Sequence, residues 1–354
     1  MKGYYWFLSN GAAYVSYKPI NADYLERNFY FKPKKNLRVP DKSIIIKIFY
    51  YLNNNIGFFP VQEDLKIIRE ELRQIGHGSV EFNSSFSPGI GLITLHNSER
   101  HNALSGKMMA ELADIVDKLE NITQDKTNSK DENDLVALIL SGNGNTFCSG
   151  LDLGVAKNHI VTPENGKKMS SLMQDALLRF SRLPLISIAA IEGYALGGGA
   201  ELTTACDHRC MSATAKIRFV HVKMATTPGW GGGGRLINII GKTNALRVLG
   251  ASELLTGQQA YDIGYIDIIA KKGETINRSK EFLDPYIYFS PKEGELDAER
   301  RRNSVKAVRG MKAIIAKAND SGMQRNFMRF EHTLFCSLWG QGENLAELLK
   351  KKVK

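Results

Sequence analysis

The chain has 354 residues, of which 43% are hydrophobic and 24% charged, and this balance excludes a disordered, collagen-like or fibrous protein. Its apolar runs fall well short of the roughly 20 residues that a membrane-spanning helix needs, and its four cysteines are too few and too scattered for a disulfide framework. Nine Lys or Arg and three acidic residues in the first sixty positions carry six of the ten net positive charges, so the rest of the chain shows no basic groove for a nucleic acid.

The predicted elements begin only after an atypical segment, residues 1–61. Its first sixty residues hold 15 of the 32 aromatic residues and show no sustained period of two or 3.6. Ser9 and Asn10 cut its opening apolar patch below the length of a convincing signal peptide. We therefore predict a poorly ordered extension or an artefact of gene prediction, with a targeting segment as the alternative.

Beyond this segment the hydrophobic pattern alternates between helix and strand. In chain order it predicts a helix over 62–75, strands around 79–82 and 91–95, a helix over 105–119, a strand over 135–140, a helix over 168–183, a strand over 185–191 and a helix over 198–206. Ser105 has the side chain and position of an N-cap. Unbroken apolar strands between helices are typical of a layered α/β core whose sheet is buried on both faces.

From about residue 235 onward the pattern is almost wholly helical. The last three predicted helices cover 298–318, 324–338 and 343–351. We therefore expect an α/β core over 62–272 and a helical C-terminal region over 273–354.

Two turns built from small residues follow buried strands of this core, at 147–153 and at 193–201. Backbone N–H groups at the carboxyl end of a strand are left unpaired and can face a ligand. In the second turn three successive glycines lead into a helix, whose dipole adds roughly half a positive charge. If two such amides converge they form an oxyanion hole, in which each donor is worth roughly 10²–10³ in rate. A glycine triplet alone is usually a tight turn or a close packing contact; the two turns together, in this order, are much more specific and favour a site.

In order and spacing these turns resemble those of the crotonase (enoyl-CoA hydratase/isomerase) superfamily, and the likeness runs from about residue 90 to the C-terminus. Shorter matching pieces lie at 99–104, 205–207, 228–232 and 260–264. The resemblance implies a ββα spiral core, with a helical C-terminal region for oligomerisation and site closure. It also implies homotrimers, alone or paired into hexamers, an acyl-CoA thioester as substrate, and no cofactor or metal.

The resemblance further assigns a site, residue by residue. The N–H groups of Leu151 and Gly198 would hold the thioester oxygen, and Glu201 would lie beside the acyl group. The remaining predicted substrate contacts are Arg100, Asn102, Ala103, Leu104, Ser149, Gly150, Asp152, Leu153, Gly197 and Trp230.

Which reaction follows depends on the acidic residues. The family's hydratases use two glutamates, and the first maps onto Glu201. The second should fall just after a strand expected over 218–221, where Lys223 replaces it if two inserted residues are allowed. Losing a positioned proton-transfer group would cost hydration roughly 10²–10⁴ in rate. Decarboxylation of a malonyl-type thioester needs only an oxyanion hole for the enolate and a proton afterwards. The sequence therefore favours decarboxylation.

In detail, segments 195–207, 217–221, 228–232 and 338–345 are similar to those of superfamily members that decarboxylate ethylmalonyl-CoA and, less readily, methylmalonyl-CoA. This likeness implies a cytosolic carboxy-lyase with a metabolite-repair role in fatty acid metabolism; a mitochondrial location is the alternative. An enoyl-CoA hydratase or isomerase that uses Glu201 alone is the nearer rival. A non-catalytic RNA- or acyl-CoA-binding homologue is the more distant one, and neither nucleic acid nor a membrane is expected as a partner.

Several roles stay open at this stage. Glu201 could position the substrate, supply the proton, or only complement the helix dipole. Trp230 could wall the acyl pocket or pack in the core, and His221 is read as a structural hydrogen-bonding residue rather than an acid. Lys223 is left out of the mechanism because clamping the substrate carboxylate would oppose CO₂ loss. Cys206 and Cys210 have no zinc spacing, and all four cysteines are expected as reduced thiols.

Overall fold

The computed structural model describes residues 5–9, 12–16, 62–124, 129–288, 302–319 and 322–350. The chain divides into two units, residues 1–55 and 56–354. In the first, β1 (Tyr5–Ser9) and β2 (Ala12–Ser16) pair as antiparallel strands. This pairing was not predicted from the sequence, although Asn10-Gly11 between two strand-like runs is a hairpin signal. The rest of the predicted extension, including 17–61, lies outside the described residues.

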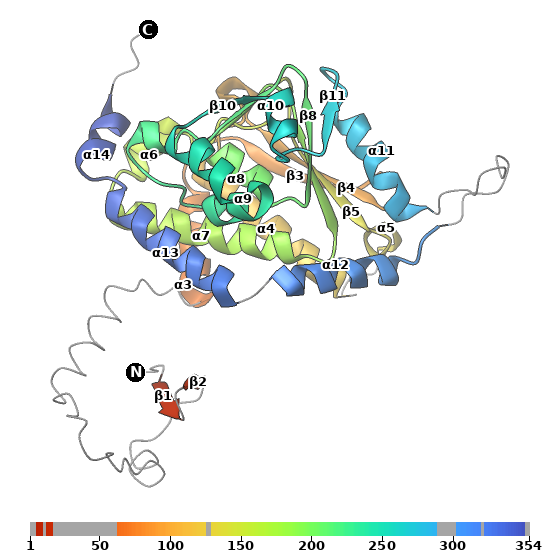
Figure 1. The fold of residues 1–354 in the computed structure, drawn as a ribbon, viewed down its shortest axis with the longest axis horizontal. Helices are drawn as coiled ribbons and strands as arrows, with labels where there is room; N and C mark the ends of the chain where they lie inside the picture. Colours follow the sequence, from red (N-terminus) through yellow and green to blue (C-terminus); the bar gives the residue numbers. More distant parts are fainter. Residues whose placement is uncertain are drawn as a thin grey trace. The chain divides into compact units, whose positions relative to one another are not determined.

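The second unit is built on a six-stranded sheet in the order β11-β8-β6-β5-β4-β3 (Figure 1). Its strands are β3 (Ser79–Ser87), β4 (Ile90–His96), β5 (Ala137–Gly142), β6 (Ile186–Ile191), β8 (His208–Ser212) and β11 (Ile268–Ala270). All neighbouring pairs are parallel except the β3–β4 hairpin. Parallel neighbours require helical crossovers, as the predicted alternation of strand and helix implied.

Both faces of this sheet are buried, which explains its unbroken apolar strands. In β5, Leu138 and Leu140 belong to one core cluster, whereas Ala137 and Ile139 belong to the other. Helices α4 (Gly106–Thr123) and α7 (Pro163–Arg182) cover the first face and α11 (Thr275–Ile287) covers the second (Figure 1). As predicted, Ser105 caps α4: its hydroxyl accepts the Met108 N–H at 3.2 Å.

A smaller sheet has three strands in the order β10-β9-β7. Its strands are β7 (Tyr194–Leu196), β9 (Lys216–Arg218) and β10 (Leu254–Thr256). The remaining elements are α3 (Gln62–Arg73), η1 (Ser98–Arg100), α5 (Lys130–Asn133), α6 (Leu153–His159), α8 (Gly198–Thr204), η2 (His221–Met224), α9 (Gly232–Gly250), α10 (Gly257–Asp262), α12 (Val305–Asn319), α13 (Gly322–Leu338) and α14 (Gly342–Leu349). Within the described ranges, no helix combines the length and apolarity needed to cross a bilayer.

Besides small shifts at the ends of elements, the structure differs from the sequence prediction in the following places. β10 and β11 interrupt the region predicted as almost wholly helical; each has three residues, too few to display a period of two. The strand expected over 218–221 ends at Arg218, and the 3₁₀ turn η2 begins at His221. The helix expected from residue 298 is described only from 302 onward and begins at Val305.

Candidate active site

The two small-residue turns lie against each other. Cys148 and Ala195 form a parallel bridge between them, and the Leu196 N–H donates to the Cys148 carbonyl at 3.0 Å. Gly150 has φ +94°, and a Cβ there would lie 2.6 Å from the Leu196 carbonyl oxygen and 3.1 Å from the Gly198 nitrogen. Only glycine permits this conformation and this close approach. The sequence therefore brings the Leu151 and Gly198 backbones to one place.

Both backbone N–H groups predicted for the oxyanion hole are unpaired. The Leu104 N–H donates to the Gly150 carbonyl at 2.7 Å, and the Asp152 N–H donates to the Leu104 carbonyl at 3.0 Å, so the N–H of Leu151 between them points to the opposite side. Gly198 is the first residue of α8, where an N–H has no acceptor within the helix. In the described part of the chain no hydrogen bond uses either group. This arrangement suits an oxygen that gains negative charge.

A cavity of about 740 Å³ opens beside these amides, a size typical of small-molecule sites. The predicted site residues that line it are Arg100, Ala103, Ser149, Gly150, Leu151, Asp152, Leu153, Gly197, Gly198, Glu201 and Trp230. Trp230 is 3% exposed, so it packs in the core and also walls the cavity.

Asn102 and Leu104, which were predicted as substrate contacts, do not line the cavity, and both are fully buried. The Asn102 side chain accepts the Asn97 N–H at 2.9 Å and donates to the carbonyls of Asn143 and Thr146 at 2.9 and 2.7 Å. Leu104 pairs with Leu151. These two residues hold the cavity wall in place instead of forming its surface.

Several lining residues were not predicted from the sequence. Phe335, Trp339 and Leu348 come from α13, the turn after it and α14, and Met169 comes from α7. Their helices were predictable from periodicity, but periodicity does not say where a helix packs.

Glu201 lies at the cavity wall with its carboxylate fully engaged. Oε1 accepts from His221 Nε2 at 3.0 Å and from the Gly229 N–H at 3.2 Å. Oε2 accepts from the N–H groups of Trp230 and Gly232, both at 2.9 Å. The residue is 1% exposed, so these four donors replace water around a buried charge.

The hydrogen-bond donors around Glu201 keep its carboxylate ionised. Burial acts to raise the pKa of Glu201, but the hydrogen bond and charge of His221, with the N–H groups of Gly232 and Trp230, outweigh it and lower the pKa. Glu201 is therefore an anion. His221 contacts the Glu201 carboxylate. Lys223, which was expected opposite Glu201 from the sequence, is exposed instead.

The loop that binds Glu201 is itself held from outside by α7 and α13. The Ser170 hydroxyl donates to the Gly229 carbonyl at 2.6 Å and contacts His332 Nδ1 at 2.9 Å. The Gly234 N–H donates to Glu331 Oε2 at 3.1 Å. The C-terminal helices therefore position the loop as well as line the cavity.

Glu331 leads to a pH prediction. Burial and then the charge of Glu201 raise its pKa to about 8, against the opposing charge of Arg235. Between pH 4.5 and 8 the unfolded chain releases this proton and the folded chain keeps it, so stability falls as pH rises. The glutamine in Glu331→Gln cannot titrate. We therefore expect the Tm of this variant minus the Tm of the wild type to increase by at least about 2 °C between pH 5 and pH 8.5. Parallel Tm curves would contradict this.

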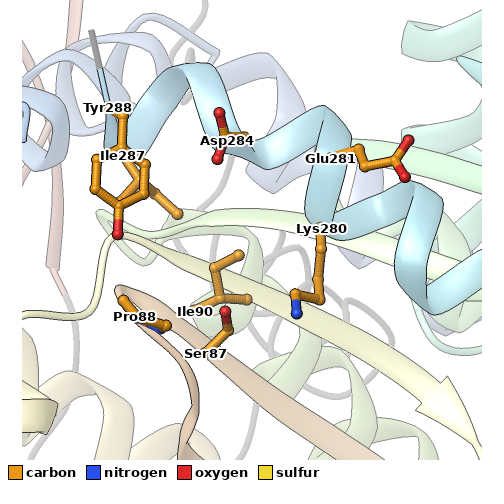
Figure 2. A pocket seen from close by; sticks show the side chains of 8 residues that line it. All are labelled: Ser87, Pro88, Ile90, Lys280, Glu281, Asp284, Ile287 and Tyr288. Carbon is orange, nitrogen blue, oxygen red and sulfur yellow. The ribbon is translucent and has the colours of Figure 1, made fainter. Parts of the chain in front are cut away.

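A second, smaller hollow of about 370 Å³ lies between the β3–β4 turn and α11 and shares no residue with the cavity. Figure 2 shows Lys280 pointing toward Ser87 and Ile90, while the carboxylates of Glu281 and Asp284 point away from them. Its polar groups do not converge on one point, so it offers no comparable site.

Within the described residues, no group of three or more His, Cys, Asp or Glu side chains could hold a metal ion. Cys148, Cys206, Cys210 and Cys336 are free thiols.

Known proteins resemble this chain in both sequence and fold. A family model described as enoyl-CoA hydratase/isomerase matches residues 85–282. Ethylmalonyl-CoA decarboxylase of Rattus norvegicus is 37% identical over 302 residues, which cover 84% of this chain and 90% of the relative. The Homo sapiens protein of that name is 36% identical over 287 residues, or 80% and 85% of the two chains.

Among solved structures, an enoyl-CoA hydratase/isomerase from Mycobacterium paratuberculosis aligns with a TM-score of 0.62 at 17% identity, covering 76% of this chain and 96% of that one. One from Xanthobacter autotrophicus Py2 also has a TM-score of 0.62, at 21% identity, with coverage of 75% and 90%. At these identities the likeness concerns the fold alone, and it confirms the fold predicted from the sequence.

Proposed function

The chain belongs to the enoyl-CoA hydratase/isomerase family, and from this premise we propose that it decarboxylates ethylmalonyl-CoA. The observation that carries the proposal is the pair of unpaired N–H groups, of Leu151 and Gly198, beside a cavity large enough for an acyl thioester. The choice of substrate rests on the relatives named ethylmalonyl-CoA decarboxylase, which are similar to this chain over most of both lengths.

In this proposal the two N–H groups bind the thioester carbonyl oxygen. The bond between the α-carbon and the carboxylate breaks, CO₂ leaves, and the electron pair passes into the thioester as an enolate. The N–H donors stabilise the negative charge on the enolate oxygen, each by a factor of roughly 10²–10³ in rate. A proton then adds to the α-carbon and gives butyryl-CoA, so each turnover consumes one proton.

The rest of the cavity suits the loss of a charged group. Met169, Val220, Trp230, Phe335 and Trp339 supply apolar surface. A carboxylate held against such surface is poorly solvated, and conversion to neutral CO₂ relieves that cost.

Hydration has less support because no second carboxylate is free to act opposite Glu201. Of the other acidic residues that line the cavity, Glu99 is exposed, and Asp152 caps α6 by accepting the N–H groups of Gly154 and Val155 at 2.7 and 3.2 Å. A proton-transfer pair flanking an alkene would need both carboxylates near the acyl group.

The finer expectations from the sequence belong to the same proposal. Methylmalonyl-CoA is the expected second substrate, and a cytosolic metabolite-repair role in fatty acid metabolism stays a prediction. Assembly into trimers, alone or paired, is supported by the exposed apolar face of α12, where Met311, Ile314 and Ile315 are 64%, 67% and 59% exposed.

The test is to incubate the purified protein with ethylmalonyl-CoA, methylmalonyl-CoA and crotonyl-CoA in turn. We expect butyryl-CoA and CO₂ from the first, slower CO₂ release from the second, and no 3-hydroxybutyryl-CoA from the third. Formation of 3-hydroxybutyryl-CoA without CO₂ release would favour the hydratase, and no turnover of any thioester would favour a non-catalytic binder.

A further inference from the structure

Two apolar side chains pack on the turn that carries the second oxyanion N–H. A Cβ added to Gly198 would overlap Cζ3 and Cη2 of Trp230 and lie 2.8 Å from Cε3, so the indole ring rests directly on this residue. A Cβ added to the preceding Gly197 would lie 3.2 Å from Cγ2 of Val220. Trp230 and Val220 both line the cavity. The cavity wall next to the Gly198 N–H is therefore built from these two side chains.

The Trp230 ring lies close to where the acyl group of a thioester would bind. A backbone nitrogen lies about 2.5 Å from the Cβ of its own residue, so the overlapping ring carbons are within about 5 Å of the Gly198 nitrogen. In the proposed decarboxylation, on which this inference rests, that nitrogen holds the thioester oxygen at about 2.9 Å. The α-carbon is only two bonds from this oxygen. The group attached to the α-carbon therefore comes within contact range of the indole.

Trp230 is held in place on both sides of its peptide backbone. Its N–H donates to Glu201 Oε2 at 2.9 Å, and its carbonyl accepts from Arg235 Nη2 at 2.8 Å. The Phe335 ring packs on the preceding Gly229, where an added Cβ would lie 2.7 Å from Cδ2 and from Cε2 of that ring. A wall that is packed this closely accommodates an extra methylene group poorly.

We propose that Trp230 is a specificity-determining residue, whose indole ring limits the α-substituent of the substrate to about the size of an ethyl group. Ethyl is the group that the proposed function requires to fit, and a butyl group at the same carbon would overlap the ring. One methylene group in a hydrophobic pocket is worth roughly 10–200-fold in kcat/KM. The substrate class is therefore malonyl thioesters with short α-alkyl groups, and the cavity wall excludes the longer ones.

The test compares ethylmalonyl-CoA with butylmalonyl-CoA in the wild-type protein, in Trp230→Phe and in Trp230→Leu. Both variants keep the backbone N–H that binds Glu201. We expect the wild-type protein to prefer the ethyl substrate at least about 100-fold in kcat/KM. This preference should fall at least about tenfold in Trp230→Leu, with Trp230→Phe in between. The ratio of two kcat/KM values in one sample does not depend on the folded fraction, so a loss of stability does not produce this result.

Trp339→Phe is the control, because it makes the same change elsewhere in the cavity wall. Trp339 packs on Gly166 of α7, and its Nε1 donates to the Ile160 carbonyl at 2.6 Å. This variant should keep the wild-type preference for the ethyl substrate, whatever its overall rate. An unchanged preference in both Trp230 variants would overturn the proposal. So would a preference that falls as far in Trp339→Phe as in Trp230→Phe, or a wild-type protein that accepts both substrates equally.

A binding measurement separates this inference from the proposed reaction. Butyryl-CoA and hexanoyl-CoA carry the same ethyl and butyl groups on the α-carbon but no carboxylate, so calorimetric titration gives their Kd values without turnover. The wild-type protein should bind hexanoyl-CoA at least about tenfold more weakly than butyryl-CoA, and Trp230→Leu should bind the two within about threefold of each other. This pattern would support the size limit even if ethylmalonyl-CoA were not decarboxylated. Equal wild-type affinity for the two thioesters would overturn it even if decarboxylation were observed.

Discussion

Replacing Gly198 with proline is expected to lower kcat for ethylmalonyl-CoA by at least roughly 10²–10³, the usual cost of removing one oxyanion donor. Proline has no N–H, and the N–H of Gly198 has no acceptor in the described part of the chain, so no structural hydrogen bond is lost. Gly198 is the first residue of α8, a position that tolerates proline. The loss should therefore appear in turnover while the fold is retained.

Gly198→Ala is the matched control, because any Cβ at this position overlaps the Trp230 ring. Both variants push the ring aside, but only alanine keeps the N–H. Activity should follow the order glycine, alanine, proline, with the largest step between alanine and proline, and circular dichroism should show that both variants fold. Equal activity of the two variants would mean that this N–H does not bind the oxygen.

The two turns could be paired from the sequence because each has local signals and because their order and spacing resemble those of the enoyl-CoA hydratase/isomerase family. Unbroken apolar strands such as β5 and β6 are typical of a sheet buried on both faces, and small residues directly after them leave N–H groups at the sheet's edge. Gly150 adds the tolerance for positive φ that lets the two turns touch. That these amides lie together was implied by the resemblance, because local signals do not bring together residues so far apart in the sequence.

The partner of Glu201 was not predictable in the same way. The strand expected from the sequence ran through His221, and with two inserted residues it placed Lys223 opposite the glutamate. In the structure the strand stops at Arg218, and η2 turns His221 toward the carboxylate. A change from a strand to a 3₁₀ turn shifts which side chains face a given side, so a small error in an element's end exchanges one candidate for another.

The positions in which the C-terminal helices pack also could not be predicted from the sequence. The periodicity of residues 324–338 predicts a helix with an apolar side, and the structure confirms it as α13. That Phe335 lines the cavity, and that Glu331 and His332 hold the loop around Gly229, depends on contacts between residues more than 90 positions apart. Helical pattern says which side of a helix is buried, but not against what.

The second large effect is expected at Glu201. Glu201→Gln preserves the shape of the side chain but turns one acceptor oxygen into an NH₂ donor. In either orientation that NH₂ group faces donors: His221 Nε2 and the Gly229 N–H on one side, or the N–H groups of Trp230 and Gly232 on the other. Losing a buried charge and two of its partners should lower the free energy of unfolding by at least about 3 kcal/mol, measured from urea midpoints.

Glu192→Gln is the matched control, because it measures the general cost of replacing a hydrogen-bonded glutamate with glutamine. Glu192 accepts the N–H groups of Gly273 and Thr275, at 2.9 and 3.4 Å, through a single oxygen, Oε1. The amide oxygen of glutamine can accept both, so this variant should cost less than about 1 kcal/mol. If Glu201→Gln were as mild, the four hydrogen bonds at Glu201 could not be what fixes its charge. The role of proton source would then again be open to Glu201.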